Sequence, residues 1–139
     1  MGLDSIWQLP EGVEHPRVGK LNLSGGIMSG PNWNAETCTS FRGKVYSDFM
    51  EIVTGFSLYE ESISGDELRS IARSLREFRD KLATLTPGYA TLEYLDNLFG
   101  VREVNNPDGF TWGLQGLDDL INMFEVYSEI EGAQLRSWY

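Results

Sequence analysis

The chain has 139 residues, 41% of them hydrophobic, with one cysteine and one histidine. Twenty-one acidic against eleven basic residues give a net charge of −10, which disfavours a surface for duplex DNA or anionic lipid. A single thiol and a single imidazole exclude an internal disulfide and a zinc site built on cysteine and histidine.

The first quarter of the chain predicts little regular structure. Residues 1–18 are interrupted by prolines and a glycine and are expected to be irregular, with Leu3, Ile6 and Trp7 fixed to the core. Alternation of polar and apolar residues predicts a strand over 20–24. Residues 25–37 are rich in glycine and asparagine and predict a loop long enough to suggest a function.

The middle of the chain predicts two helices. A fourfold spacing of apolar residues predicts an amphipathic helix over 43–55, followed by a strand over 56–59. Ser64 and Glu67 have the spacing of a capping box, in which each side chain bonds a free amide of the first helical turn. A continuous apolar stripe behind them predicts a helix over 65–84.

The last part of the chain predicts two helices and three strands. Threonine followed by proline predicts a helix start and a helix over 86–99, and the turn formers of Asn-Asn-Pro-Asp-Gly predict a hairpin over 101–114. Helical spacing returns over 117–131, with two aspartates expected in the first turn. Two aromatic residues near the end predict a docked strand over 133–139.

Helices and strands therefore alternate in short pieces without a linker. This pattern predicts a compact single α+β domain over residues 1–139, with three to four helices packed on a small, mainly antiparallel sheet. The N-terminal residues lack the basic region of a signal peptide and no apolar run is long enough for a membrane span, so we expect a cytoplasmic protein with no membrane partner. The short edge strands leave a homodimer open.

Groups that bind anions collect near the end of the long loop. Three hydroxyl side chains, the last on Ser40, precede Arg42-Gly43-Lys44 at the start of a predicted helix. Hydroxyls, two cations and free helix amides suit a phosphate, and Trp33 in the preceding loop could stack on a base. The predicted ligand-binding residues are Trp33, Asn34, Ser40, Arg42 and Lys44.

Plainer interpretations remain open for the same residues. Arg42 and Lys44 could pair with nearby acids such as Glu36 or Asp48, which would leave no free cation. Trp33 could anchor the loop to the core instead of holding a ligand.

No set of residues predicts catalysis. His15 lies among turn formers and is expected to be a solvated loop residue. Cys38 has no second cysteine nearby and is expected to be a small, half-buried filler. No acidic stretch has EF-hand spacing, and neither a metal nor a cofactor is predicted, although twenty-one acids leave a carboxylate site for Mg²⁺ or Ca²⁺ open. A carboxylate-metal hydrolase is the least favoured class.

Three stretches of sequence resemble an uncharacterised family of small phage and microbial proteins. They are MGLDSIW at 1–7, SFRGKVY at 40–46 and TGFSLY at 54–59. The resemblance covers parts of the first half of the chain and implies no activity. It implies a context in which small proteins are commonly capsid accessories or inhibitors of host defence, including proteins that sequester nucleotide signals.

Two functions follow as hypotheses. The first is a non-enzymatic binding protein that sequesters a phosphate-bearing or nucleotide-like ligand or blocks a host factor, in the host cytoplasm if a phage encodes it. The alternative is an acidic interaction module that inhibits a basic partner, because an acidic surface speeds the capture of a basic target.

Overall fold

The computed structural model describes residues 3–25, 27, 30, 33–82, 84 and 113–138. Its elements are β1 (Asp4–Gln8), α1 (Val18–Leu21), β2 (Ser40–Phe41), α2 (Gly43–Thr54), β3 (Ser62–Ser64), α3 (Asp66–Leu82), α5 (Gly113–Ser128) and β4 (Gln134–Trp138). The predicted helix over 86–99 and nearly all of the predicted hairpin over 101–114 lie outside the described residues.

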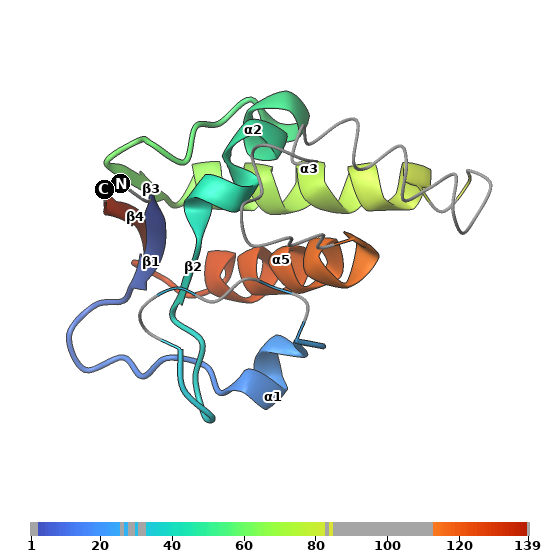
Figure 1. Ribbon diagram of the computed structural model, residues 1–139. Helices are drawn as coiled ribbons and strands as arrows, with labels where there is room; N and C mark the ends of the chain where they lie inside the picture. Colours follow the sequence, from blue (N-terminus) through green and yellow to red (C-terminus); the bar gives the residue numbers. More distant parts are fainter. Residues whose placement is uncertain are drawn as a thin grey trace.

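The four strands form one antiparallel sheet in the order β2-β1-β4-β3. Its centre joins the two ends of the chain, since β1 pairs with β4 from Asp4 opposite Trp138 to Gln8 opposite Gln134. Figure 1 accordingly shows the two termini side by side at one edge of the molecule. This arrangement confirms the predicted α+β class, and β4 confirms the docked strand predicted at the end of the chain.

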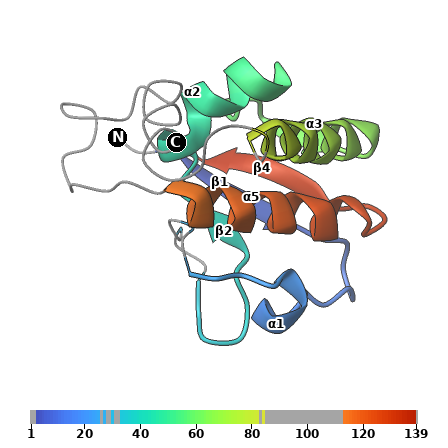
Figure 2. The ribbon, with the colours of Figure 1, turned by 90° about the vertical axis from the view of Figure 1, so that its right-hand side faces the viewer.

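The helices α2, α3 and α5 lie on one face of the sheet, with α3 in contact with both other helices (Figures 1 and 2). The core fills the space between this layer and the sheet. Trp7 of β1 stacks on Tyr127 of α5 with ring centroids 4.4 Å apart, and it meets the edge of Phe124 at 5.0 Å. Leu3 and Trp7 are both buried, as the sequence predicts, whereas Ile6, predicted with them, is only half-buried.

The two central helices form as predicted. Helix α2 ends at Gly55, whose φ of 78° is the left-handed conformation that glycine adopts without strain. Helix α3 buries the predicted apolar stripe. Its predicted capping box does not form, because Ser64 belongs to β3 and Gly65 separates the strand from the helix.

Four other predictions are wrong in detail. The segment expected to be irregular contains β1, whose pairing partner is at the far end of the chain. Residues 20–24 do not form a strand, because α1 ends at Leu21 and Asn22 takes the left-handed conformation that closes it. Residues 56–59 form a turn, and the strand begins only at Ser62. Helix α5 begins at Gly113, within the predicted hairpin, and ends at Ser128. Among the described residues, no helix is long and apolar enough to cross a membrane.

Candidate functional site

The first turn of α2 presents two cations to solvent. Gly43 packs closely on β1, because a Cβ atom there would lie 2.5 Å from Ser5 Oγ and 3.1 Å from Leu3 Cγ. With Gly43 buried against the sheet, the flanking side chains of Arg42 and Lys44 are exposed. Close packing of the glycine thus leaves the side chains on either side of it, one with a guanidinium and one with an ammonium, on the surface.

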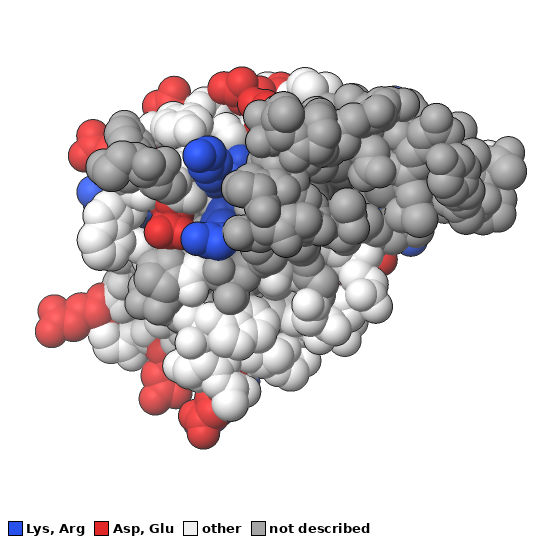
Figure 3. All heavy atoms as spheres, in the orientation of Figure 1, with Lys and Arg blue, Asp and Glu red and all other residues white. Residues whose placement is uncertain are grey.

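Neither cation forms an ion pair with an acid in the described part of the chain. The expected acid Glu36 pairs instead with Arg17, with Nη1 and Oε2 2.9 Å apart. Asp48, the other expected acid, takes no part in an ion pair within the described ranges. Figure 3 shows Lys and Arg side chains gathered over the start of α2, with one acidic group beside them.

The backbone of this turn has fewer free amide donors for an anion than the sequence suggests. The amide of Lys44 donates to Leu3 O at 3.1 Å, and that of Val45 donates to Arg42 O at 3.1 Å. Ser40 is fully buried beside Gly30, where a Cβ atom would lie 2.6 Å from Ser40 Oγ. An anion at this place would therefore be held by the two side chains and not by the Ser40 hydroxyl.

Trp33 and Asn34 lie at the far end of a hairpin that leads into β2. Trp33 bridges to Cys38, and Asn34 Oδ1 accepts hydrogen bonds from the amides of Glu36 and Thr37 at 2.7 and 2.8 Å. These bonds make the turn that Figure 1 shows pointing away from the start of α2. From Cys38 to Arg42 the chain can span at most about 13 Å at about 3.3 Å per residue.

The structure therefore places Arg42 and Lys44 on the surface at the start of α2, whereas Trp33 lies at the far end of the hairpin. The Trp33 side chain is 37% exposed, so it is not anchored in the core either. A ligand that contacts both ends of the hairpin would have to extend along β2.

The only thiol of the chain is buried and unreactive. Cys38 has no exposed surface, and its Sγ donates a weak hydrogen bond to Ser40 O at 3.4 Å. Burial raises the pKa of the Cys38 thiol to about 12, so almost none of the nucleophilic thiolate exists at neutral pH. Cys38 fills space in the core more completely than the half-buried position expected for it.

The only imidazole links three segments, which corrects its assignment as a solvated loop residue. Tyr127 donates its hydroxyl proton to Cys38 O at 3.2 Å, and His15 Nδ1 lies 2.9 Å from the same hydroxyl. The chain of bonds fastens the N-terminal segment to α5 and the hairpin.

This link predicts a pH-dependent stability. Burial lowers the pKa of His15 below its usual value of 6.5, so the unfolded chain takes up a proton before the folded one does. The free energy of unfolding should therefore fall as the pH drops below about 6.5, and the loss should level off once the folded imidazole is also protonated.

Urea denaturation at pH 7.5 and 5.5 measures this effect. The substitution His15→Gln keeps a hydrogen-bonding side chain and removes the titration, so the variant should lose less stability between the two pH values than the unmodified protein. Equal losses in both proteins would show that His15 does not contribute.

Two aspartates of α5 have roles that the sequence did not indicate. Asp119 is 1% exposed, and its carboxylate accepts hydrogen bonds from Ser24 N and Oγ, Gly25 N and Ile27 N at 2.7–3.1 Å. Asp118 accepts a bond from Arg79 Nε of α3 at 2.7 Å. Helix α5 begins four residues earlier than predicted, so neither lies in its first turn and the assignment to the helix dipole is wrong.

Comparison with known proteins supplies no relative. No family model, no curated protein and no solved structure matches the chain. Among the described residues, no group of three or more His, Cys, Asp or Glu side chains is placed to hold a metal ion. The function has to be argued from the residues themselves.

Proposed function

We propose that the protein is a non-enzymatic binding protein whose ligand carries a phosphate or similar anionic group bound by Arg42 and Lys44. The observation that carries the proposal is the pair of exposed cations without an ion-pair partner in the described part of a chain of net charge −10. In so acidic a protein, two cations this close in the sequence would be expected to form ion pairs with acidic side chains. A guanidinium and an ammonium together suit an oxyanion with several acceptor oxygens.

Binding is favoured over catalysis by the state of the other reactive groups. The pKa of the Cys38 thiol is far above neutral, and the His15 imidazole is engaged with Tyr127. The Asp119 carboxylate is saturated by donors from residues 24–27. Each of these three groups is thus committed to holding the fold.

The ligand class follows from what surrounds the two cations. Ser40 is buried and the first amides of α2 are engaged, so recognition depends on charge and on the reach of two long side chains. Such a site suits a diphosphate or a phosphodiester better than a single small ion, because two cations can contact separate oxygens. Stacking of a base on Trp33 would require a ligand that extends along the hairpin.

Isothermal titration calorimetry with pyrophosphate, ATP and cyclic di-GMP tests the proposal. Arg42→Ala and Lys44→Ala should each weaken binding about tenfold or more, because each removes a charge-assisted hydrogen bond worth roughly 1.5–3 kcal/mol. Lys20→Ala is the matched control, since Lys20 is an exposed cation of α1 far along the chain from this site. Absence of binding to all three compounds, or equal binding by the two variants and the control, would refute the proposal.

A second candidate function, the acidic interaction module, is favoured by the opposite edge of α2. Ile52 is 59% exposed and Tyr59 is 47% exposed, so both side chains are open to contact with a partner. Exposed acids accompany them in the sequence at Glu51 and Glu60, and Figure 3 shows acidic groups along this upper edge. A basic partner with an apolar side chain would fit such an edge, and its binding should weaken strongly with salt.

The resemblance to small phage proteins bears on how a binding function would be used. A binding protein of this kind would act by sequestering a phosphate-bearing signal or by blocking a host factor, and in the cytoplasm of the host if a phage encodes it. Anion binding at Arg42 and Lys44 supports sequestration, whereas the acidic edge supports blocking.

A further inference from the structure

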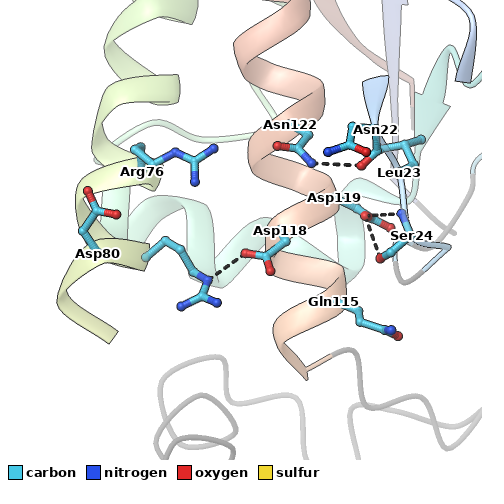
Figure 4. Close-up of a pocket in the computed structure, with 10 residues that line it drawn as sticks. Asn22, Leu23, Ser24, Arg76, Asp80, Gln115, Asp118, Asp119 and Asn122 are labelled. Carbon is cyan, nitrogen blue, oxygen red and sulfur yellow. Dashed lines mark hydrogen bonds and ion pairs between the residues drawn. The ribbon is translucent and has the colours of Figure 1, made fainter. Parts of the chain in front are cut away.

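A second place on the molecule has the form of a ligand site, and it lies on other elements than Arg42 and Lys44. A cavity of about 660 Å³ opens over α5, between α3 and the turn at residues 22–24. Figure 4 shows α5 running between these two walls, with side chains reaching into the space from each. The volume is within the range of roughly 300–1,000 Å³ that small-molecule sites occupy.

The floor of the cavity is one polar face of α5. Gln115, Asp118 and Asn122 follow one another at helical spacing and all line the cavity. Leu23 is the one apolar side chain among the described lining residues. An apolar ligand would gain less here than a polar one, because most of the lining surface is polar.

The walls are fixed by hydrogen bonds between elements. Arg76 of α3 binds Glu125 of α5 through two nitrogens, at 2.6 and 3.1 Å, and this bond raises the pKa of Arg76 above its usual value. Asn122 Nδ2 donates to Asn22 O at 3.0 Å. Side chains that are already held in place lose little conformational entropy when a ligand binds.

Hydrogen-bonding capacity remains on both sides of the space. Arg79 uses only Nε toward Asp118 among the described residues, which leaves its two terminal nitrogens as donors. Asp118 keeps one carboxylate oxygen as an acceptor, and Asn122 keeps its side-chain carbonyl. Asp80, next to Arg79, has no hydrogen bond within the described ranges and offers a whole carboxylate.

The charges of the lining decide against an anion. The described lining residues include two arginines and three aspartates, and the charge of Arg76 is also neutralised by Glu125. A phosphate would meet a surface of net negative charge. A neutral molecule with many hydroxyl groups fits better, because each hydroxyl can accept from an arginine and donate to a carboxylate or amide oxygen.

We propose that this cavity binds a neutral, hydroxyl-rich ligand of the saccharide class, with Arg79 donating and Asp80, Asp118 and Asn122 accepting. The site is separate from the anion site at the start of α2, so the protein would hold two chemically different ligands or two parts of one large glycosylated ligand. Substitutions at one site should leave the other unchanged.

Ligand-observed saturation-transfer NMR and calorimetry with D-glucose, D-ribose and sucrose test the proposal on the full chain. At least one of these compounds should bind, with affinity lowered about tenfold in Asp80→Ala and about fivefold in Gln115→Ala. Neither side chain has a hydrogen bond within the described residues, so both variants should fold normally. Glu77→Ala removes an exposed acid of α3 outside the cavity and should bind as the unmodified protein does.

Three results would overturn the proposal. One is the absence of saturable binding by all three saccharides up to about 10 mM, a limit that corresponds to a very weak interaction. Another is saccharide binding that neither Asp80→Ala nor Gln115→Ala changes. The third is binding of the polycation spermidine with no binding of the saccharides, which would assign the cavity to cations.

Discussion

Trp7→Ala should destabilise the protein more than any other single truncation in the described core. The indole is 2% exposed, stacks on Tyr127, and packs against Phe124 in a T-shaped arrangement and against Phe41 in a tilted one. Removing a buried aromatic side chain of this kind costs about 3–5 kcal/mol through lost burial and the cavity that remains. The midpoint of thermal unfolding should fall by on the order of 10 °C, as measured by circular dichroism.

Two further substitutions make this result specific to the buried ring. Trp138→Ala removes the same side chain from a position that is 65% exposed in β4, and it should change the free energy of unfolding by about 0.5 kcal/mol or less. Trp7→Phe should cost much less than Trp7→Ala, because the buried Trp7 Nε1 has no hydrogen-bond partner to lose among the described residues. Similar losses in Trp7→Ala and Trp138→Ala would contradict the described core.

Asp119→Ala should reduce the free energy of unfolding by about 3 kcal/mol. The substitution leaves four donors of residues 24–27 without their acceptor, and one of them, the amide of Ile27, is buried. Each buried donor left unpaired costs roughly 1–3 kcal/mol, and the exposed donors recover part of their loss by binding water. Urea denaturation monitored by tryptophan fluorescence measures the change.

The neighbouring residue provides the control for Asp119. Asp118→Ala removes the same group from a side chain that is 43% exposed and paired with Arg79, so it should cost only up to about 1 kcal/mol. Asp119→Asn keeps the shape of the side chain but places an NH₂ group against two N–H donors, and it should cost nearly as much as Asp119→Ala. If Asp118→Ala proved as damaging as Asp119→Ala, the role assigned to the buried carboxylate would be wrong.

Local sequence patterns predicted the helices of this fold better than its strands. Helices α2 and α3 depend on apolar spacing within one segment, and both formed almost where predicted. Strand β1 depends on β4, more than a hundred residues away, so its five residues contain little that marks them as a central strand. The spacing of Leu21 and Leu23 fits an alternating strand. It fits equally well the end of a short helix that Asn22 closes in the left-handed conformation.

The candidate sites also divide into features that local sequence predicts and features that depend on distant contacts. The cations at Arg42 and Lys44 could be recognised because all the relevant residues are adjacent in the sequence. The bonds of Asp119 to residues 24–27 join parts of the chain about a hundred residues apart, and no local pattern indicates them. The adjacent aspartates did carry one usable signal, because successive residues of a helix point about 100° apart and one of a pair is often directed inward.

The most direct test of the account is a ¹H–¹⁵N NMR titration of the full chain with pyrophosphate, which maps binding residue by residue. The account predicts saturable shifts centred on the amides of residues 42–45 and on the Arg42 Nε–H, with little change around His15 or Asp119. Lys44→Ala should weaken this response about tenfold or more, whereas Lys20→Ala should leave it intact. Shifts that do not saturate, or that centre elsewhere while residues 42–45 remain unperturbed, would contradict anion binding at the start of α2.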